Sequence, residues 1–233
     1  MNQGILEWFM TFPKTRMLAV LCLAAACGPM MAAGAAVPPP QVDEPLAAKP
    51  GQAVAVVAGG CFWGVQAVFQ HTRGVLRATS GYAGGTADTA RYNIVSSETT
   101  DHAESVQVTY DPSQITFGQL LRVFFSVAHD PTQRDRQGPD SGRSYRSVIF
   151  TTTPDQARIA RAYIAQLDAA KAFRVPIVTE VSAPMPFFPA EDYHQDYATL
   201  HPDDMYIRIN DAPKVAQLKQ LLPELYSEKK APY

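Results

Sequence analysis

Cysteine is scarce in this chain of 233 residues, which contains only Cys22, Cys27 and Cys61. An excess of positive charge is also missing, because 20 Lys and Arg stand against 22 Asp and Glu for a net charge of −2. The chain therefore lacks the basic field with which proteins bind nucleic acid, and we expect no nucleic-acid partner. Charged residues make up 18% and hydrophobic residues 46%, a composition that excludes wholesale disorder and suits one compact domain.

The motifs of several common enzyme classes are absent as well. The sequence has no G-x-S-x-G elbow and no phosphate-binding loop, which removes two such classes. Its five histidines show no His-x-x-x-His spacing, and no Cys-x-x-Cys pair occurs. We therefore expect no metal site and place most of the histidines in loops or on the surface. No repeat of fixed period is present, which argues against a solenoid or a propeller.

The first apolar run is too short to be a convincing membrane span. It extends over residues 17–26, after Lys14 and Arg16, and a Gly-Pro pair then breaks it, whereas a spanning helix needs ~20 residues. Together with the small residues at 32–36, this is the pattern of a secretory signal. We predict a signal peptide over residues 1–36 and export to the periplasm.

The exported chain keeps one cysteine for certain. Leu23–Cys27 loosely resembles the cleavage box of a lipoprotein, so a lipid anchor at Cys27 is an alternative to cleavage near Ala36. Only Cys61 lies clear of the presequence, and a single thiol cannot form an internal disulfide. A lone cysteine in an oxidising compartment is either buried or chemically used.

The rest of the chain reads as a linker, one domain and a tail. Pro- and Ala-rich residues 37–51 predict a tether, and we place the domain at 52–225 and the tail at 226–233. Strands are predicted at 53–58, 75–80, 103–110, 145–150 and 177–181, with helices after 60, after 116, over 153–167 and near 213. This interleaving predicts an α+β (mixed α/β) fold, a ferredoxin-like two-layer sandwich whose central mixed sheet is covered by helices mainly on one face.

Local turn chemistry sharpens some of these boundaries. Thr116 and Gln119 form a capping box, which predicts a helix start. Residues 81–89, with three glycines, and residues 129–143, rich in Gly, Pro and Asp, predict loops. The Pro-rich stretch 184–189 interrupts the pattern of strands and helices.

Cys61 stands at a shaped turn. It follows Gly59-Gly60 at the predicted first turn of a helix, where unpaired N–H groups and the helix dipole favour an anion and hence a thiolate. The alternative is an ordinary packed core thiol.

Glu104 lies on the apolar face of a predicted strand, together with Val106, Val108 and Tyr110, because residues two apart point the same way. Burial of a carboxylate on such a face raises its pKa and would make it a general acid at neutral pH. The alternative is that Glu104 sits at a strand end and reaches water.

From about Val54 to Leu222, the sequence resembles a known family, the peptide methionine sulfoxide reductases of the A type. The resemblance rests on an ordered series of motifs: Gly60-Cys-Phe-Trp-Gly64, Gly81-Tyr-Ala-Gly-Gly85, His102-Ala-Glu104, Tyr110-Asp-Pro112, His129-Asp-Pro131, Tyr145-Arg-Ser147 and Ala190-Glu-Asp-Tyr-His-Gln195. It implies a thiol-dependent oxidoreductase that reduces methionine S-sulfoxide in peptides and proteins, and free methionine S-sulfoxide, and so repairs oxidised exported proteins.

The resemblance also assigns roles to residues. It implies that the nucleophile attacking the sulfoxide sulfur is Cys61, which becomes a sulfenic acid, while Glu104, Tyr92 and Tyr145 bind the sulfoxide oxygen. Glu104 would deliver the proton.

Substrate contacts follow in the same way. Phe62 and Trp63 would form an apolar wall around the S-methyl group, with core packing as the alternative. Asp140 and His194 resemble positions that orient the substrate backbone.

The chain departs from many relatives at its C-terminal end, because residues 203–233 contain no cysteine that could recycle the sulfenic acid. It therefore looks like a one-cysteine variant without a bound cofactor, whose Cys61 is reduced by an external thiol such as a thioredoxin-like protein or a small dithiol. We expect a monomer that meets oxidised proteins or peptides and this reductant.

Two rival functions remain at this stage. A cysteine-dependent hydrolase would pair Cys61 with His102 or His194 and turn over esters without a reductant. A non-catalytic domain would bind oxidised peptides without turnover.

Overall fold

The computed structural model describes residues 35–233. Most of the predicted signal peptide, and Cys27 with its alternative lipid anchor, lie outside the described residues. No helix in the described part of the chain is long and apolar enough to cross a membrane.

Six strands form the central sheet in the order β7-β6-β1-β3-β2-β8. They are β1 (Ala53–Gly59), β2 (Val75–Ala83), β3 (Ala103–Tyr110), β6 (Ser147–Phe150), β7 (Glu180–Ser182) and β8 (Phe187–Pro189). Neighbouring strands are antiparallel except for the parallel pair β6 and β7, so the sheet is mixed. Two short strands, β4 (Arg136–Gln137) and β5 (Asp140–Ser141), pair with each other outside it.

The helices alternate with the strands in a ferredoxin-like order. They are α1 (Phe62–Gln70), α2 (Tyr92–Val95), α3 (Phe117–Val123), α4 (Pro154–Ala169), α5 (Tyr197–Leu200) and α6 (Ala212–Leu221). The chain order β1-α1-β2-β3-α3-β6, with β6, β1, β3 and β2 adjacent in that order, is the ferredoxin-like β-α-β-β-α-β unit. The predicted fold class is therefore confirmed.

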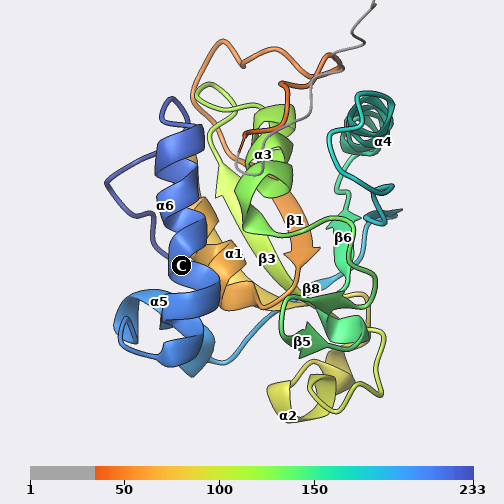
Figure 1. Ribbon diagram of the computed structural model, residues 1–233, viewed down its shortest axis with the longest axis vertical. Coiled ribbons are helices and arrows are strands. Elements are labelled where there is room, and N and C mark those ends of the chain that lie inside the picture. Colours follow the sequence, from red (N-terminus) through yellow and green to blue (C-terminus); the bar gives the residue numbers. More distant parts are fainter. Residues whose placement is uncertain (1–34) are drawn as a thin grey trace, which may run out of the picture. The chain divides into compact units, whose positions relative to one another are not determined.

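Short helical turns link these elements. Three are 3₁₀ turns, η1 (Ala87–Thr89), η3 (Arg143–Tyr145) and η4 (Asp192–His194). Two are π-helical turns, η2 (Phe124–Ala128) after α3 and η5 (Ile207–Asp211) before α6. In Figure 1, α6 runs beside α1, against which it packs.

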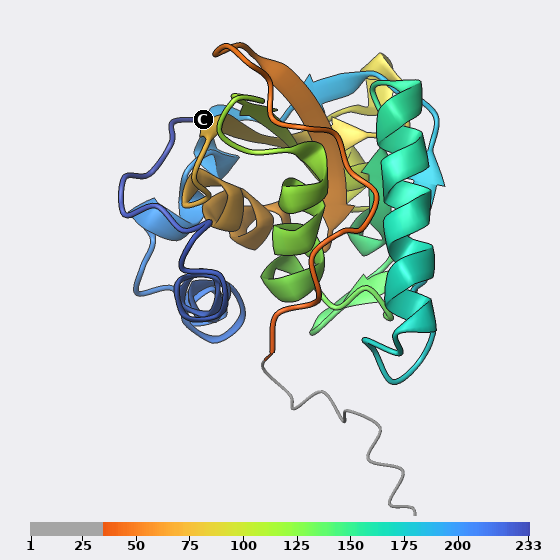
Figure 2. The same cartoon turned by 90° about the horizontal axis from the view of Figure 1, so that it is seen from above.

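The alternation along β1 sorts the core into two layers. Ala55 and Val57 join the large cluster formed with the helices, whereas Val56 and Ala58 join a smaller cluster on the opposite face. Side chains of α1, α3, α4 and α6 all belong to the large cluster, and Figure 2 shows the sheet and these helices from above. The helices thus cover mainly one face of the sheet, as predicted.

Several boundaries differ from the sequence prediction. β2 extends through Gly81–Ala83, which the glycine content had placed in a loop, because these residues pair with both β3 and β8. β6 begins at Ser147, and Tyr145 lies in η3 instead. The strand predicted at 177–181 is displaced to Glu180–Ser182. The Pro-rich stretch contains the short edge strand β8, where proline is tolerated because one side needs no hydrogen bond.

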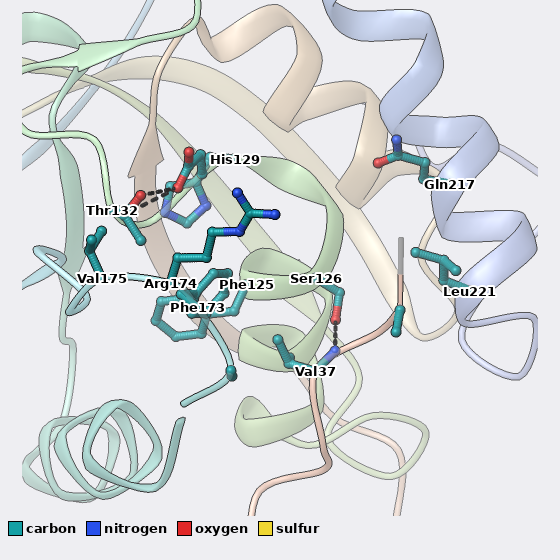
Figure 3. A pocket seen from close by; sticks show the side chains of 13 residues that line it. Val37, Phe125, Ser126, His129, Thr132, Phe173, Arg174, Val175, Gln217 and Leu221 are labelled. Atoms are coloured by element: carbon teal, nitrogen blue, oxygen red, sulfur yellow. Dashed lines mark hydrogen bonds between the residues drawn. The ribbon is translucent and has the colours of Figure 1, made fainter. Parts of the chain in front are cut away.

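The segment 37–51, predicted to be a tether, instead runs along the domain, and we call it the strap. Val37 is 3% exposed and donates its N–H to Ser126 Oγ at 3.2 Å, beside a cavity of about 470 Å³ (Figure 3). Arg122 donates to the Val37 carbonyl, and the Tyr163 hydroxyl donates to that of Pro38. The Pro and Ala content indicated a free linker, but these distant donors hold the strap in place.

The tail at 226–233 is ordered in the same way. Tyr226 forms an antiparallel bridge with Thr72, and the N–H of Ala78 donates to the carbonyl of Pro232 at 3.0 Å. The tail therefore continues the packing of the domain around α1 and β2.

Candidate active site

The turn before α1 places Cys61 at the N-cap of that helix. Gly60, between β1 and Cys61, has φ +87°, and a Cβ there would lie 2.4 Å from the Gln137 side chain. Only glycine meets both constraints without strain. The thiol of Cys61 is buried, with 7% of the residue exposed.

Glu104 faces this turn from β3, where it is paired with Tyr82 of β2. Its Oε2 accepts a hydrogen bond from the backbone N–H of Phe62 at 3.0 Å. Only 4% of Glu104 is exposed, so the alternative in which it reaches water is excluded. The nucleophile candidate and the acid candidate thus meet at one helix terminus.

Burial raises the pKa of the Glu104 carboxyl to about 8. The Phe62 N–H opposes this shift because it stabilises the carboxylate, while Asp140 adds to it by charge repulsion. Glu104 therefore holds a proton at neutral pH, as the alternation of β3 predicted.

The prediction that the helix terminus makes Cys61 a thiolate is wrong for this structure. Burial raises the pKa of the thiol, and the carboxylates of Glu104 and Asp211 raise it further. The backbone N–H of Trp63 and the ammonium of Lys214 lower it, but they do not prevail. The resting site therefore contains a neutral thiol beside a neutral carboxyl.

Aromatic rings build a wall on one side of Cys61. Trp63 stacks on Tyr197, with ring centroids 3.8 Å apart, and meets Tyr206 edge-on at 6.0 Å. Phe62 is 1% exposed and lies against Tyr82. Trp63 is half-buried, so it offers surface to a ligand, whereas Phe62 packs as a core residue beneath it.

His194 belongs to the same wall. Its ring lies 5.1 Å from that of Phe62 and 4.4 Å from that of Tyr92. The indole N–H of Trp63 donates to its Nδ1 at 3.2 Å, and burial lowers its pKa. The ring is therefore neutral with its hydrogen on Nε2. Within residues 35–233 this buried Nε2 has no hydrogen-bond partner.

Tyr92 and Tyr145 come from two separate loops. Burial raises the pKa of each hydroxyl, and both Glu104 and Cys61 add to the shift, which places the two phenols in the electrostatic field of the site. The backbone N–H of Tyr92 donates to Glu191 Oε1 at 3.0 Å. Glu191 also accepts from the Tyr82 hydroxyl, so it ties the Tyr92 loop to β2.

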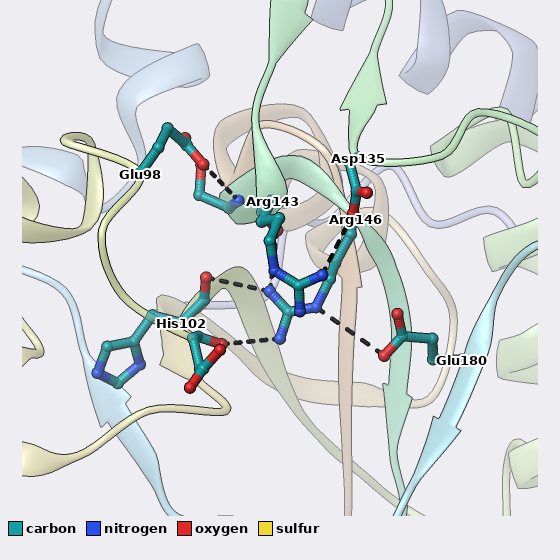
Figure 4. A network of polar contacts seen from close by, with 8 residues as sticks. Glu98, His102, Asp135, Arg143, Arg146 and Glu180 are labelled. Atoms are coloured by element: carbon teal, nitrogen blue, oxygen red, sulfur yellow. Dashed lines mark hydrogen bonds and ion pairs between the residues drawn. The ribbon is translucent and has the colours of Figure 1, made fainter.

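The Tyr145 loop is fixed by a polar network (Figure 4). Glu98 accepts from the backbone N–H and the hydroxyl of Ser144. Arg146 donates to the carbonyls of Asp101, His102 and Arg143, and its Nε lies 4.0 Å from Glu180. Glu98 has φ +60°, a left-handed conformation that a side chain rarely adopts without support. The loops that carry the two tyrosines are thus joined.

Asp140 enters the site from β5. Its Oδ2 accepts a hydrogen bond from the Tyr206 hydroxyl, and Tyr206 packs on Trp63. Six of the other seven residues singled out from the sequence are linked by contacts beside Cys61, and the seventh, Tyr145, lies in the same electrostatic field.

Sequence reasoning missed several residues of this site. Tyr197, Tyr206 and Glu191 contact the predicted residues, and Asp211 acts on Cys61 through its charge, but none of the four had an assigned role. Glu191 lies within a motif already quoted, beside His194, which is the one signal that could have identified it. The two tyrosines lie in a segment with no recognisable period.

Four of the five histidines, His71, His102, His129 and His201, lie outside regular helices and strands, as expected from the sequence. His102, His129 and His194 are nevertheless buried, with 0%, 8% and 2% exposed, and each ring hydrogen-bonds within the fold. Among residues 35–233, no group of three or more His, Cys, Asp or Glu side chains could hold a metal ion.

Comparison with known proteins identifies the family of this chain. The family model for peptide methionine sulfoxide reductase matches residues 53–225. Peptide methionine sulfoxide reductase MsrA 2 of Mesorhizobium japonicum is 59% identical over 182 residues, covering 78% of this chain and 93% of that protein. MsrA 2 of Synechocystis is 50% identical, covering 79% and 87%.

Solved structures are similar too. Methionine sulfoxide reductase A of Corynebacterium diphtheriae has a TM-score of 0.56 and 38% identity, covering 66% of this chain and 77% of that one. Reduced Mxr1 of Saccharomyces cerevisiae has a TM-score of 0.57 and 31% identity, covering 65% and 86%. The family match extends over most of the chain and includes every residue of the site described above, so the chain belongs to the peptide methionine sulfoxide reductase family.

Proposed function

We propose that this reductase converts methionine S-sulfoxide, in peptides and proteins or free, to methionine with Cys61 as the nucleophile. The observation that carries the proposal is the meeting of a thiol and a protonated carboxyl at the N-terminus of α1, where Glu104 Oε2 accepts from the Phe62 N–H. Preference for the S epimer follows from family resemblance.

The oxygen-transfer step balances within these groups. Cys61 sulfur attacks the sulfoxide sulfur while the Glu104 carboxyl gives its proton to the sulfoxide oxygen, because a sulfoxide becomes electrophilic only as its oxygen is protonated. The thiol proton replaces the one that Glu104 gives up. The S–O bond of the substrate breaks, oxygen ends on Cys61 as a sulfenic acid, and methionine leaves reduced by two electrons.

A neutral resting pair suits this step. Two charges at a buried site are costly, so a thiolate beside a carboxylate would be unfavourable before substrate binds. The raised pKa values of Cys61 and Glu104 keep both groups protonated until the sulfoxide oxygen can accept the first proton. Tyr92 and Tyr145, whose hydroxyls stay protonated, can donate hydrogen bonds to that oxygen.

Substrate binding uses the aromatic wall. Trp63, half-buried above Phe62, supplies apolar surface for the S-methyl group. The Nε2–H of His194, which has no hydrogen-bond partner within residues 35–233, can donate to a peptide carbonyl, and Asp140, anchored by Tyr206, can accept from a peptide N–H.

Recycling requires an external thiol. Cys61 is the free cysteine of the described residues, and residues 203–233 contain none. One thiol attacks the sulfenic acid to give a mixed disulfide and water, and a second thiol releases Cys61 and leaves as a disulfide. We propose a thioredoxin-like protein or a small dithiol in this role, and a monomeric enzyme.

No observation favours the hydrolase. His102 uses Nδ1 to accept from the Gly85 N–H and Nε2 to contact the Thr86 carbonyl, and His194 Nδ1 is taken by Trp63. Neither ring is hydrogen-bonded to Cys61 within the described part of the chain. A general base for a hydrolytic cysteine needs that contact.

Export to the periplasm is part of the proposal, supported by the signal pattern of residues 1–36. Its substrates would then be oxidised envelope proteins. Mass measurement of the protein recovered from the periplasm tests this: loss of the signal is expected, and recovery of the uncleaved chain from the cytoplasm would refute it.

A single-turnover reaction without reductant tests the chemistry. The full chain carrying C22S and C27S, so that Cys61 is its one thiol, is mixed with a peptide containing methionine S-sulfoxide, and both are weighed by mass spectrometry. We expect about one equivalent of methionine peptide and a gain of one oxygen on the protein.

The matched control adds Cys61→Ser, which should leave both masses unchanged. Binding without any mass change in the Cys61 protein would refute the reductase reaction and favour the oxidised-peptide binding domain. Ester hydrolysis without reductant would favour the hydrolase.

A further inference from the structure

A buried ion pair lies behind the turn that carries Cys61. Asp211, the N-cap of α6, is 0% exposed, and its Oδ1 lies 3.0 Å from the Nζ of Lys214 one turn later. The Lys214 side chain is 17% exposed, so the ammonium lies near the edge of the core and the carboxylate deep inside it.

This ion pair contacts the first turn of α1 directly. Gly64 is the third residue of that helix, and a Cβ at this position would lie 2.0 Å from Asp211 Oδ1 and 2.8 Å from Lys214 Nζ. The absence of a side chain at Gly64 therefore lets both charges approach the helix backbone three residues from Cys61. Neither Asp211 nor Lys214 has a part in the oxygen-transfer step proposed above.

The ion pair is also incompletely satisfied. Asp211 Oδ2 is buried and has no hydrogen-bond partner within residues 35–233. A buried carboxylate oxygen without a partner is costly, and a purely structural ion pair is expected to satisfy both oxygens. The cost indicates that the charge serves something beyond the packing of α6 on α1.

We propose that Asp211 and Lys214 are positioning residues that set the ionisation of Cys61 in opposite directions: Asp211 keeps the thiol protonated in the empty enzyme, and Lys214 stabilises the anionic sulfur as its proton leaves. Because of the contact at Gly64, both charges lie against the first turn of α1. The proposal rests on the proposed function only in taking Cys61 as the reacting group.

The two charges shift the pKa of Cys61 in the proposed directions. Asp211 raises the pKa of Cys61 and Lys214 lowers it. The other titratable groups in the field of the thiol are Glu104 on β3, Tyr92 in α2, Tyr145 in η3, Tyr197 in α5 and Tyr206 before η5. Burial raises the pKa of Asp211 itself, and Lys214 opposes that shift. The ammonium therefore works against protonation of the carboxylate.

The test measures thiol ionisation rather than turnover. In the full chain with C22S and C27S, the rate of Cys61 alkylation by iodoacetamide is recorded against pH for Asp211→Asn and Lys214→Gln. Because the thiolate is the species that reacts, we expect several-fold faster alkylation at about pH 8 for D211N and several-fold slower alkylation for K214Q.

Lys219→Gln is the matched control. Lys219 lies on the same helix, is exposed and pairs with Glu228, so K219Q should alkylate at the rate of the unsubstituted enzyme. Near-ultraviolet circular dichroism checks that each variant is folded. If D211N does not fold, K214Q decides alone, because Lys214 reaches the surface.

The proposal is overturned if folded D211N alkylates no faster than the parent, or if K214Q alkylates no slower. A purely structural ion pair would move both variants in the same direction by loosening one packing contact. Alkylation needs no sulfoxide, so these outcomes are distinct from failure of the reductase reaction.

Discussion

The N-termini of α1 and α3, two helices on the same face of the sheet, are capped in different ways. At α3, side chains accept nearly every free N–H: Thr116 accepts from Gln119, Asp43 from Gly118 and Glu44 from Phe117. At α1, the N-cap Cys61 makes no capping hydrogen bond, and the carboxyl group of Glu104 accepts from Phe62.

The environments of the carboxylates differ as well. Asp43 and Glu44 arrive from the strap and are only half-buried, whereas Glu104 lies inside the core on β3. At α3 the acceptors satisfy orphan donors and stabilise the fold. At α1 the N–H groups remain directed at a reactive sulfur and a protonated acid. The comparison shows that a helix terminus can serve stability or chemistry depending on which group caps it.

The largest effect should come from removing the acid at α1. Glu104→Gln keeps an oxygen that can accept from the Phe62 N–H but loses the proton donor, so we expect kcat/KM for a methionine sulfoxide peptide to fall by ~10²–10⁴-fold. Steady-state assay with dithiothreitol measures it.

Glu44→Gln is the same substitution at the other terminus and should change kcat/KM less than about twofold, since Glu44 caps α3 away from the sulfur. Equal losses of kcat/KM in E104Q and E44Q would mean that the two helix termini do not differ in function.

The pH dependence should follow the same carboxyl. Because burial raises the pKa of Glu104 to about 8, kcat/KM should fall roughly tenfold per pH unit above that value as the proton is lost. A rate that keeps rising well past pH 8 would show that thiol deprotonation, and not the acid, limits the reaction.

Stability should reveal the cost of burying Glu104. Its folded pKa lies above its unfolded one, so its contribution is fully present below about pH 4.5 and is lost as pH rises toward about 8. Relative to the unsubstituted chain, E104Q should therefore gain stability between about pH 5 and about pH 8, by at least ~1 kcal/mol. Thermal melts of both proteins across that range measure the difference; a constant difference would contradict the raised pKa.

The smallest effect is expected from removing the N-cap side chain of α3. Thr116→Ala removes the acceptor for the Gln119 N–H and the donor to Asp43, and should cost about 1 kcal/mol in urea unfolding. Its single-turnover oxygen transfer should match that of the unsubstituted enzyme. Slower transfer in a folded T116A protein would show that the two termini are coupled.

Local signals in the sequence predicted much of this molecule. The capping box at Thr116, the alternation that turns Glu104 inward and the Gly-Gly turn before Cys61 depend on neighbours within a few residues, and the structure contains all three. Each is a rule about adjacent positions, which one sequence displays in full.

The predictions that failed depended instead on contacts between residues far apart in the chain. The thiolate prediction counted the helix terminus but not the burial of the thiol by the fold, nor the charges of Glu104 and Asp211, which lie 43 and 150 residues away along the chain. The strap looked like a linker because its caps act on α3, more than 70 residues later. Composition and spacing do not contain such long-range contacts.

The central claim is that Glu104 is protonated at the catalytic terminus in the resting enzyme. Infrared difference spectroscopy between the unsubstituted protein and E104Q, titrated in pH, tests it most directly by following the carbonyl stretch of a protonated carboxyl. The account predicts that this band is present at neutral pH and disappears with a midpoint at about pH 8. A midpoint near the ordinary value of a glutamate, ~4.3, would contradict it.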